Sequence, residues 1–141
     1  MRNWPALSRE TLERHLLVVV CAISAGIHGG LVREHFEEGV GAGSGFLAAT
    51  VLLAVTALCL GRSAAPPVTG ATALLLGGLL VSYGLVLTTG VPVLHPEVEA
   101  VDGLAIVTKA IEAIGLLAAL DLLRTRFASV LVIPRREGRL T

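Results

Sequence analysis

Apolar residues along this chain are gathered into four long blocks, separated by short stretches that are polar or contain proline. The blocks cover about 16–32, 45–60, 70–90 and 103–123. Each block is near the roughly 20 residues that a helix needs to cross the hydrocarbon core of a bilayer. The pattern therefore predicts an all-α fold, a four-helix antiparallel transmembrane bundle formed by 16–123.

The stretches between the blocks predict three connections, at 33–44, 61–69 and 91–102. Pro66, Pro67 and Pro92 indicate turns, because proline cannot continue a helix that it interrupts. A cleavable signal peptide is the competing interpretation of the first block. The block is long for that role and offers no clean small-x-small cleavage site, which favours a spanning helix.

Composition agrees with a membrane protein. Mean hydropathy is +0.80 and only 16% of the residues are charged, whereas a soluble domain has about a quarter. Net charge is zero and the arginines are not clustered around aromatic residues, so nothing favours nucleic acid as a partner. Cys21 and Cys59 lie in apolar blocks without CxxC spacing, which favours small buried side chains over a redox pair.

The distribution of charge predicts an orientation. One side of the predicted bundle receives the N-terminal segment 1–15, the second connection and the C-terminal tail 124–141. That side holds nine of the eleven basic residues: Arg2, Arg9, Arg14, Arg62, Arg124, Arg126, Arg135, Arg136 and Arg139. The positive-inside rule then places both termini in the cytoplasm of a multi-pass cell-membrane protein. Near the inner end of the fourth block, Asp121 is expected to pair with Arg124, three residues further on.

Four of the polar side chains inside the predicted spans lie at a similar depth: His28, Tyr83, Lys109 and Glu112. Counted from the outer ends of their spans at 1.5 Å per residue, all four lie within roughly 6–14 Å of the outer surface. Lys109 and Glu112 are three residues apart, so they share one helix face. A charge at the bilayer centre costs about 2.5–3.5 kcal/mol on insertion scales, so such groups usually face the protein interior.

Two interpretations of these side chains stay open at this level. In the first, they line a polar pocket or proton path that is open to the outside, with His28 titrating near neutral pH. In the second, Lys109 and Glu112 form an inert ion pair and Tyr83 is a core aromatic. Gly26 and Gly30 form a GxxxG pattern, which is typical of close helix packing in membranes.

A metal site is a further hypothesis for the outer side. His35 and Glu38, at i and i+3, would both reach one ion, and His95 with Glu97 or Glu99 would complete a mixed shell for zinc or a similar divalent ion. The competing interpretation is a solvated acidic loop with surface histidines. No CxxC or HExxH spacing strengthens the metal hypothesis.

These observations lead to three hypotheses about function. The first is a module that binds or translocates a small cation, proton or polar ligand at the outer half of the bundle. The second is a structural or accessory subunit, which docks through its small-residue faces against a second copy or another membrane protein. The third is a metal-dependent membrane enzyme that uses His35, Glu38 and His95.

We expect the purified chain to need detergent or lipid to remain monodisperse, because the apolar surfaces of four spanning helices are insoluble in water. Size-exclusion chromatography with and without detergent checks this. A monodisperse peak in plain buffer would contradict the membrane assignment.

Overall fold

The computed structural model describes residues 8–90 and 102–131, and these residues form four α-helices. The helices are α1 (Arg9–Glu38), α2 (Val40–Arg62), α3 (Pro66–Thr88) and α4 (Gly103–Leu131). All four are long and apolar enough to cross a membrane. The all-α, four-helix prediction is therefore confirmed.

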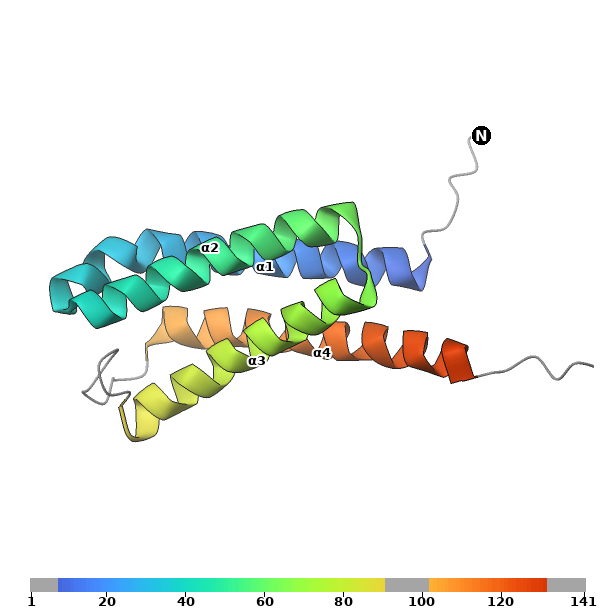
Figure 1. Ribbon diagram of the computed structural model, residues 1–141. Coiled ribbons are helices and arrows are strands. Elements are labelled where there is room, and N and C mark those ends of the chain that lie inside the picture. The colour runs from blue at the N-terminus through green and yellow to red at the C-terminus, as the bar shows by residue number, and fades with distance from the viewer. Residues whose placement is uncertain (1–7, 91–101, 132–141) are drawn as a thin grey trace, which may run out of the picture.

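The helices run alternately up and down the bundle (Figure 1). The start of α1, the α2–α3 connection and the end of α4 lie at one end, called here the inner end. The α1–α2 junction, the end of α3 and the start of α4 lie at the opposite, outer end. Helix α1 packs most extensively against α2, and α3 packs against α4. Among the helix pairs in contact, α2 and α3 have the least extensive contact.

The boundary between α1 and α2 differs from the sequence prediction. The sequence indicated a connection over 33–44, but this region is helical except for Gly39. The backbone N–H of Gly39 donates to the carbonyl of His35 at 3.0 Å and closes α1. Four residues on, Gly43 has room only for hydrogen, because a Cβ there would lie 2.2 Å from Cγ of Phe36. The missing side chain lets the Phe36 ring lie against α2 and keeps the hairpin tight.

Other helix ends follow local sequence rules. Ser8 is the N-cap of α1, and its hydroxyl accepts a hydrogen bond from the Thr11 backbone N–H at 3.2 Å, which satisfies one of the first unpaired donors. Pro66 opens α3, where a missing N–H costs nothing. Helix α4 continues past residue 123 to Leu131.

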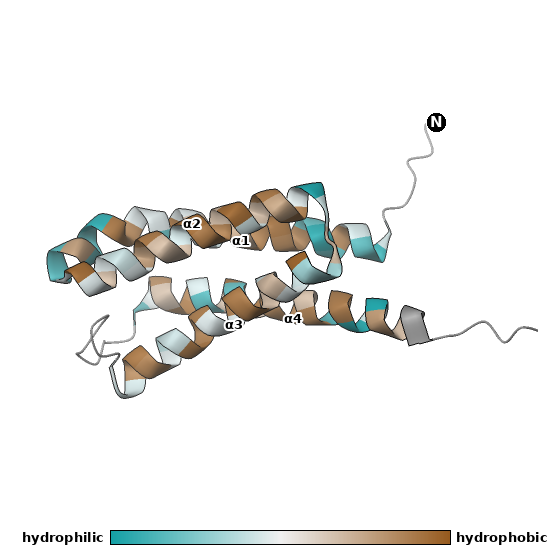
Figure 2. Cartoon of the chain, in the orientation of Figure 1, coloured by the Kyte–Doolittle hydropathy of each residue, from teal (hydrophilic) through white to brown (hydrophobic). Residues whose placement is uncertain are grey.

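The apolar core lies between the middle of the bundle and the inner end. Its buried members come from all four helices and from the α2–α3 connection: Leu17, Val20, Cys21, Ala25, Leu53, Leu60, Ala64, Ala73, Leu76, Ala119 and Leu122. Large apolar side chains also cover the outside, among them Leu58, Leu74 and Leu117. Figure 2 shows hydrophobic residues along the middle of the helices and hydrophilic ones mainly toward the ends. This distribution matches a bilayer as the surrounding solvent.

Ion pairs hold the inner end together. Arg9 of α1 pairs with Asp121 of α4, and Arg126 of α4 pairs with Glu10 of α1. Arg126 also donates to the backbone carbonyl of Ala64 in the α2–α3 connection. The sequence prediction that Asp121 pairs with Arg124 is wrong, because packing of α1 against α4 brings Arg9 to this carboxylate.

Helices α1 and α3 both pack closely against α4 at Gly115. A Cβ at this position would lie 2.6 Å from Cγ1 of Val20 and 3.0 Å from Cδ1 of Leu76. The glycine therefore lets α1 and α3 approach the backbone of α4. Because lipid tails are as apolar as leucine, such close packing is a main source of stability for helices in a membrane.

We expect Gly115→Ala to lower the free energy of unfolding by about 1–3 kcal/mol, since the added methyl overpacks a site beside the stiff Val20 side chain. Unfolding of the detergent-solubilised protein by titration with sodium dodecyl sulfate measures this. Gly78→Ala is the matched control, because no atom lies within 4 Å of its added Cβ. Equal effects of the two substitutions would contradict the packing argument.

Candidate functional site

The site is built around Glu112 of α4, whose side chain has no exposed surface. Oε1 accepts a hydrogen bond of 2.6 Å from the Ser24 hydroxyl of α1. Oε2 accepts one of 2.8 Å from the Lys109 ammonium, one turn earlier on α4. A buried carboxylate is tolerated only when it is paired and hydrogen-bonded, and both oxygens of Glu112 meet that condition.

His28 of α1 lies beside this carboxylate. Its Nδ1 is 2.9 Å from the backbone carbonyl of Ser24, and a carbonyl oxygen only accepts, so Nδ1 donates. In a neutral ring Nε2 then has a lone pair. Nε2 lies 3.9 Å from Oε1 of Glu112. The histidine is thus oriented by its own helix, with its proton-accepting nitrogen next to the buried acid.

Lys109 and Tyr83 complete the group. The Lys109 ammonium lies 5.5 Å from the centroid of the Tyr83 ring, within the range of a cation–π contact. Its side chain is 16% exposed, so the ammonium touches the buried carboxylate while part of the chain reaches open space. Helices α1, α3 and α4 therefore contribute to one polar cluster.

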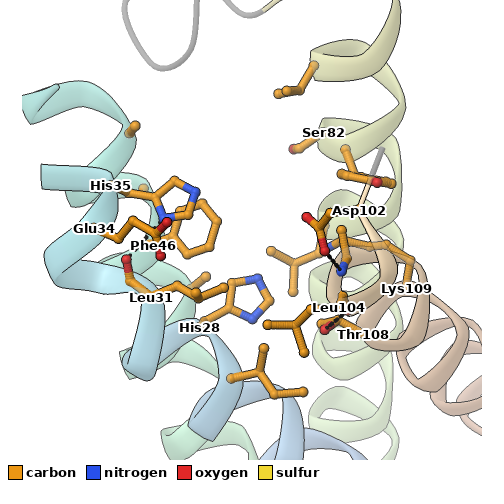
Figure 3. Close-up of a pocket in the computed structure, with 18 of the residues that line it drawn as sticks. His28, Leu31, Glu34, His35, Phe46, Ser82, Asp102, Leu104, Thr108 and Lys109 are labelled. Atoms are coloured by element: carbon orange, nitrogen blue, oxygen red, sulfur yellow. Dashed lines mark hydrogen bonds between the residues drawn. The ribbon is translucent and has the colours of Figure 1, made fainter. Parts of the chain in front are cut away.

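A cavity of about 540 Å³ opens above this cluster, in the outer half of the bundle. Figure 3 shows His28 and His35 on one side of it and Lys109, Thr108 and Asp102 on the other. Helix α2 supplies small residues and Phe46, and α3 supplies Ser82 and Tyr83 among others. The volume falls in the roughly 300–1,000 Å³ range of small-molecule pockets.

His35 lies on the same side of the cavity as His28, nearer the outer end. The His35 ring stacks on Phe46, with centroids 3.5 Å apart, and Phe46 also meets the His28 ring at 5.3 Å. Nδ1 of His35 donates to the carbonyl of Leu31 at 3.0 Å. Its Nε2 lies 4.0 Å from Oε2 of Glu38. Both histidines thus have the same orientation, with Nδ1 bonded to the helix and Nε2 left for other partners.

Toward the inner end the cluster is closed by the apolar core. Val20 and Leu76 meet at Gly115, one turn below Glu112. Within the described residues, the buried polar side chains at this inner level are Thr69 and Thr72, and their hydroxyls donate to carbonyls at or near the start of α3. The cavity is therefore accessible from the outer half and blocked from the inner half.

The structure brings together the four intramembrane residues that the sequence singled out, namely His28, Tyr83, Lys109 and Glu112. Their role in binding stays a prediction. The GxxxG residues behave otherwise: Gly26 and Gly30 face outward, and an added Cβ would meet nothing within 4 Å. They do not pack the four described helices against one another.

The metal hypothesis gains no support. Of its residues, His35 and Glu38 lie close together, whereas His95, Glu97 and Glu99 fall outside the described residues. Over 8–90 and 102–131, no group of three or more His, Cys, Asp or Glu side chains is arranged to hold a metal ion.

Sequence reasoning missed two residues of the site. Ser24 had a usable signal, because it lies four residues before His28 on the same helix face and a hydroxyl in an apolar run needs a partner. Phe46 had none. Its position between the two histidines depends on the one-residue junction at Gly39, which fixes how α2 lies against α1.

Chemically, this arrangement can hold and exchange a proton. Nε2 of His28 and Oε1 of Glu112 are both proton acceptors, and they face each other at 3.9 Å. When one of these two atoms carries a proton, the contact between two lone pairs becomes an attraction between a donor and an acceptor. The Lys109 ammonium and the Ser24 hydroxyl hold the carboxylate in place while this happens.

A comparison of the chain with protein-family models, with curated proteins and with solved structures finds no significant match. The fold and the site together define a small four-helix protein of membrane type with a polar cluster beneath an outer cavity.

We expect Glu112→Gln to lower the free energy of unfolding by about 3 kcal/mol, because it leaves the Lys109 ammonium without its charge partner. Denaturant titration of the solubilised protein measures the loss. Combining it with Lys109→Met should recover at least half of that loss, since both charges are then gone. A double variant that is as unstable as the sum of the two single variants would show that the pair is not coupled.

Proposed function

We propose that this protein is a small integral membrane protein that binds a small cation or polar ligand in its outer cavity. The observation that supports this most is the position of the cavity directly above the His28–Glu112–Lys109 cluster. Ionisable groups cost free energy inside a membrane. Their concentration beneath a cavity of small-molecule size therefore favours a functional site.

Binding is favoured over transport through the bundle. A transport path needs polar or hydrated steps on both sides of the central group, as in proton relays. Below Glu112 the described core is apolar and closely packed at Gly115. We therefore propose a one-sided site, in which His28 and Glu112 exchange a proton with the cavity rather than across the membrane.

We infer that the cavity faces outward and that both termini are cytoplasmic. The support is the positive-inside rule applied to the helix ends. Arg9, Arg14, Arg62, Arg124 and Arg126 lie toward the inner end of the bundle, whereas Arg33 lies toward the outer end.

A second candidate function is that of an accessory subunit for another membrane protein or for a second copy of this chain. The outward-facing Gly26 and Gly30 favour it, because their surface has space for a neighbouring backbone. An accessory role requires no ligand, so a ligand-binding experiment separates the two candidates.

We expect at least one compound in a panel of small inorganic cations and small polar organic molecules to raise the melting temperature of the purified protein. A ligand at 100 times its Kd adds about 2.7 kcal/mol to stability. Ala49→Trp should abolish the shift, because Ala49 lines the cavity and is buried.

The matched control is Ala48→Trp, since the neighbouring Ala48 is exposed and does not line the cavity. A shift that is retained in Ala48→Trp and lost in Ala49→Trp supports the proposal. A panel without any shift, or a shift that survives Ala49→Trp, contradicts it and leaves the accessory role.

A further inference from the structure

The charges around the cavity are unevenly distributed. Three carboxylates line it toward the outer end, from Glu34 and Glu38 in the last turns of α1 and from Asp102 just before α4. Among the described residues that line the cavity, the ammonium is that of Lys109, and its charge is matched by Glu112 directly beneath. These described side chains therefore carry more carboxylate than ammonium charge, and such a surface attracts cations.

The hydrogen-bonding groups of the wall point to the same kind of ligand. The side chains of His28 and His35 are each 8% exposed, and both rings line the cavity (Figure 3). Each ring uses Nδ1 to donate to its own helix. Neither Nε2 atom has a hydrogen-bond partner among the described residues, so in a neutral ring each can accept a hydrogen bond from a molecule in the cavity.

Two donors of the wall are already engaged. The Lys109 ammonium donates to Glu112 at 2.8 Å, and the Thr108 hydroxyl donates to the Leu104 carbonyl at 2.8 Å. A ligand that supplies N–H donors and positive charge therefore complements this cavity, whereas an anion meets carboxylates and lone pairs.

Size and apolar surface distinguish an organic cation from a metal ion. The cavity of about 540 Å³ is many times the roughly 30 Å³ that one water occupies in the liquid. Phe46, Leu79 and Leu104 are among its apolar walls. An apolar body would cover these side chains.

We propose that the ligand is a primary or secondary organic ammonium with an apolar body, whose N–H groups donate to Nε2 of His28 or to Nε2 of His35. This inference rests on the proposed binding function and specifies its ligand class. The acidic rim of Glu34, Glu38 and Asp102 draws the cation in from the outer side.

The test is calorimetric titration of the full chain in nanodiscs of zwitterionic lipid, with empty nanodiscs as the blank. The probes share one apolar body: benzylammonium, benzyltrimethylammonium, benzyl alcohol and benzoate. We expect benzylammonium to bind at least about tenfold more tightly than each of the other three, a difference of about 1.4 kcal/mol. The alcohol lacks the charge, the trimethyl compound lacks N–H donors, and benzoate has the opposite charge.

Two variants test whether the rim carboxylates contribute to the affinity for benzylammonium. Glu34→Gln combined with Glu38→Gln should weaken benzylammonium binding about tenfold, because it removes two rim charges. Glu37→Gln should leave the affinity within about twofold, since Glu37 does not line the cavity and pairs with Arg33.

Each remaining outcome decides between the two proposals. If benzoate or benzyl alcohol binds more tightly than benzylammonium and Ala49→Trp abolishes that binding, the cavity binds ligands but the proposed class is wrong. Equal affinity for benzyltrimethylammonium overturns the role of the two histidine acceptors. If benzylammonium does not bind, the ligand class fails, and the melting-temperature panel decides the proposed function separately.

Discussion

The burial of one carboxylate constrains the rest of this structure. Glu112 has no exposed surface, so each of its oxygens has to find a donor inside the bundle. Lys109 supplies one from the same helix, but the other comes from Ser24 on α1. That hydrogen bond fixes the rotation of α1 against α4. It also sets the depth at which His28 meets the acid, because His28 is one turn from Ser24 and bonded to its carbonyl.

The two halves of the bundle divide structural and chemical roles. In the inner half, apolar side chains, the close approach at Gly115 and the ion pairs of Arg9 and Arg126 hold the four helices together. In the outer half the helices leave a cavity, since small residues on α2 and the limited contact between α2 and α3 leave the space unfilled. A closely packed inner half helps polar groups to keep their geometry around an open space.

Much of the fold and part of the site could be predicted from the sequence. The four blocks gave four helices, and equal depth along three of them anticipated that His28, Tyr83, Lys109 and Glu112 would meet. The connection at 33–44 was wrong, because a single extended Gly39 is enough to reverse the chain. The partner of Asp121 was wrong too, since an i,i+3 rule considers one helix and the better partner, Arg9, lies on another.

The sequence by itself determined the number of helices and their alternating direction, because hydrocarbon thickness fixes how many apolar residues a span needs. Only the tertiary structure decided which helix faces turn inward. The helices are apolar around most of their circumference, as the exposed Leu58, Leu74 and Leu117 show, so no amphipathic stripe marks the buried side. The contacts of Ser24, Phe46 and the two histidines depend on that rotation, and for this reason they emerge only when the helices are packed.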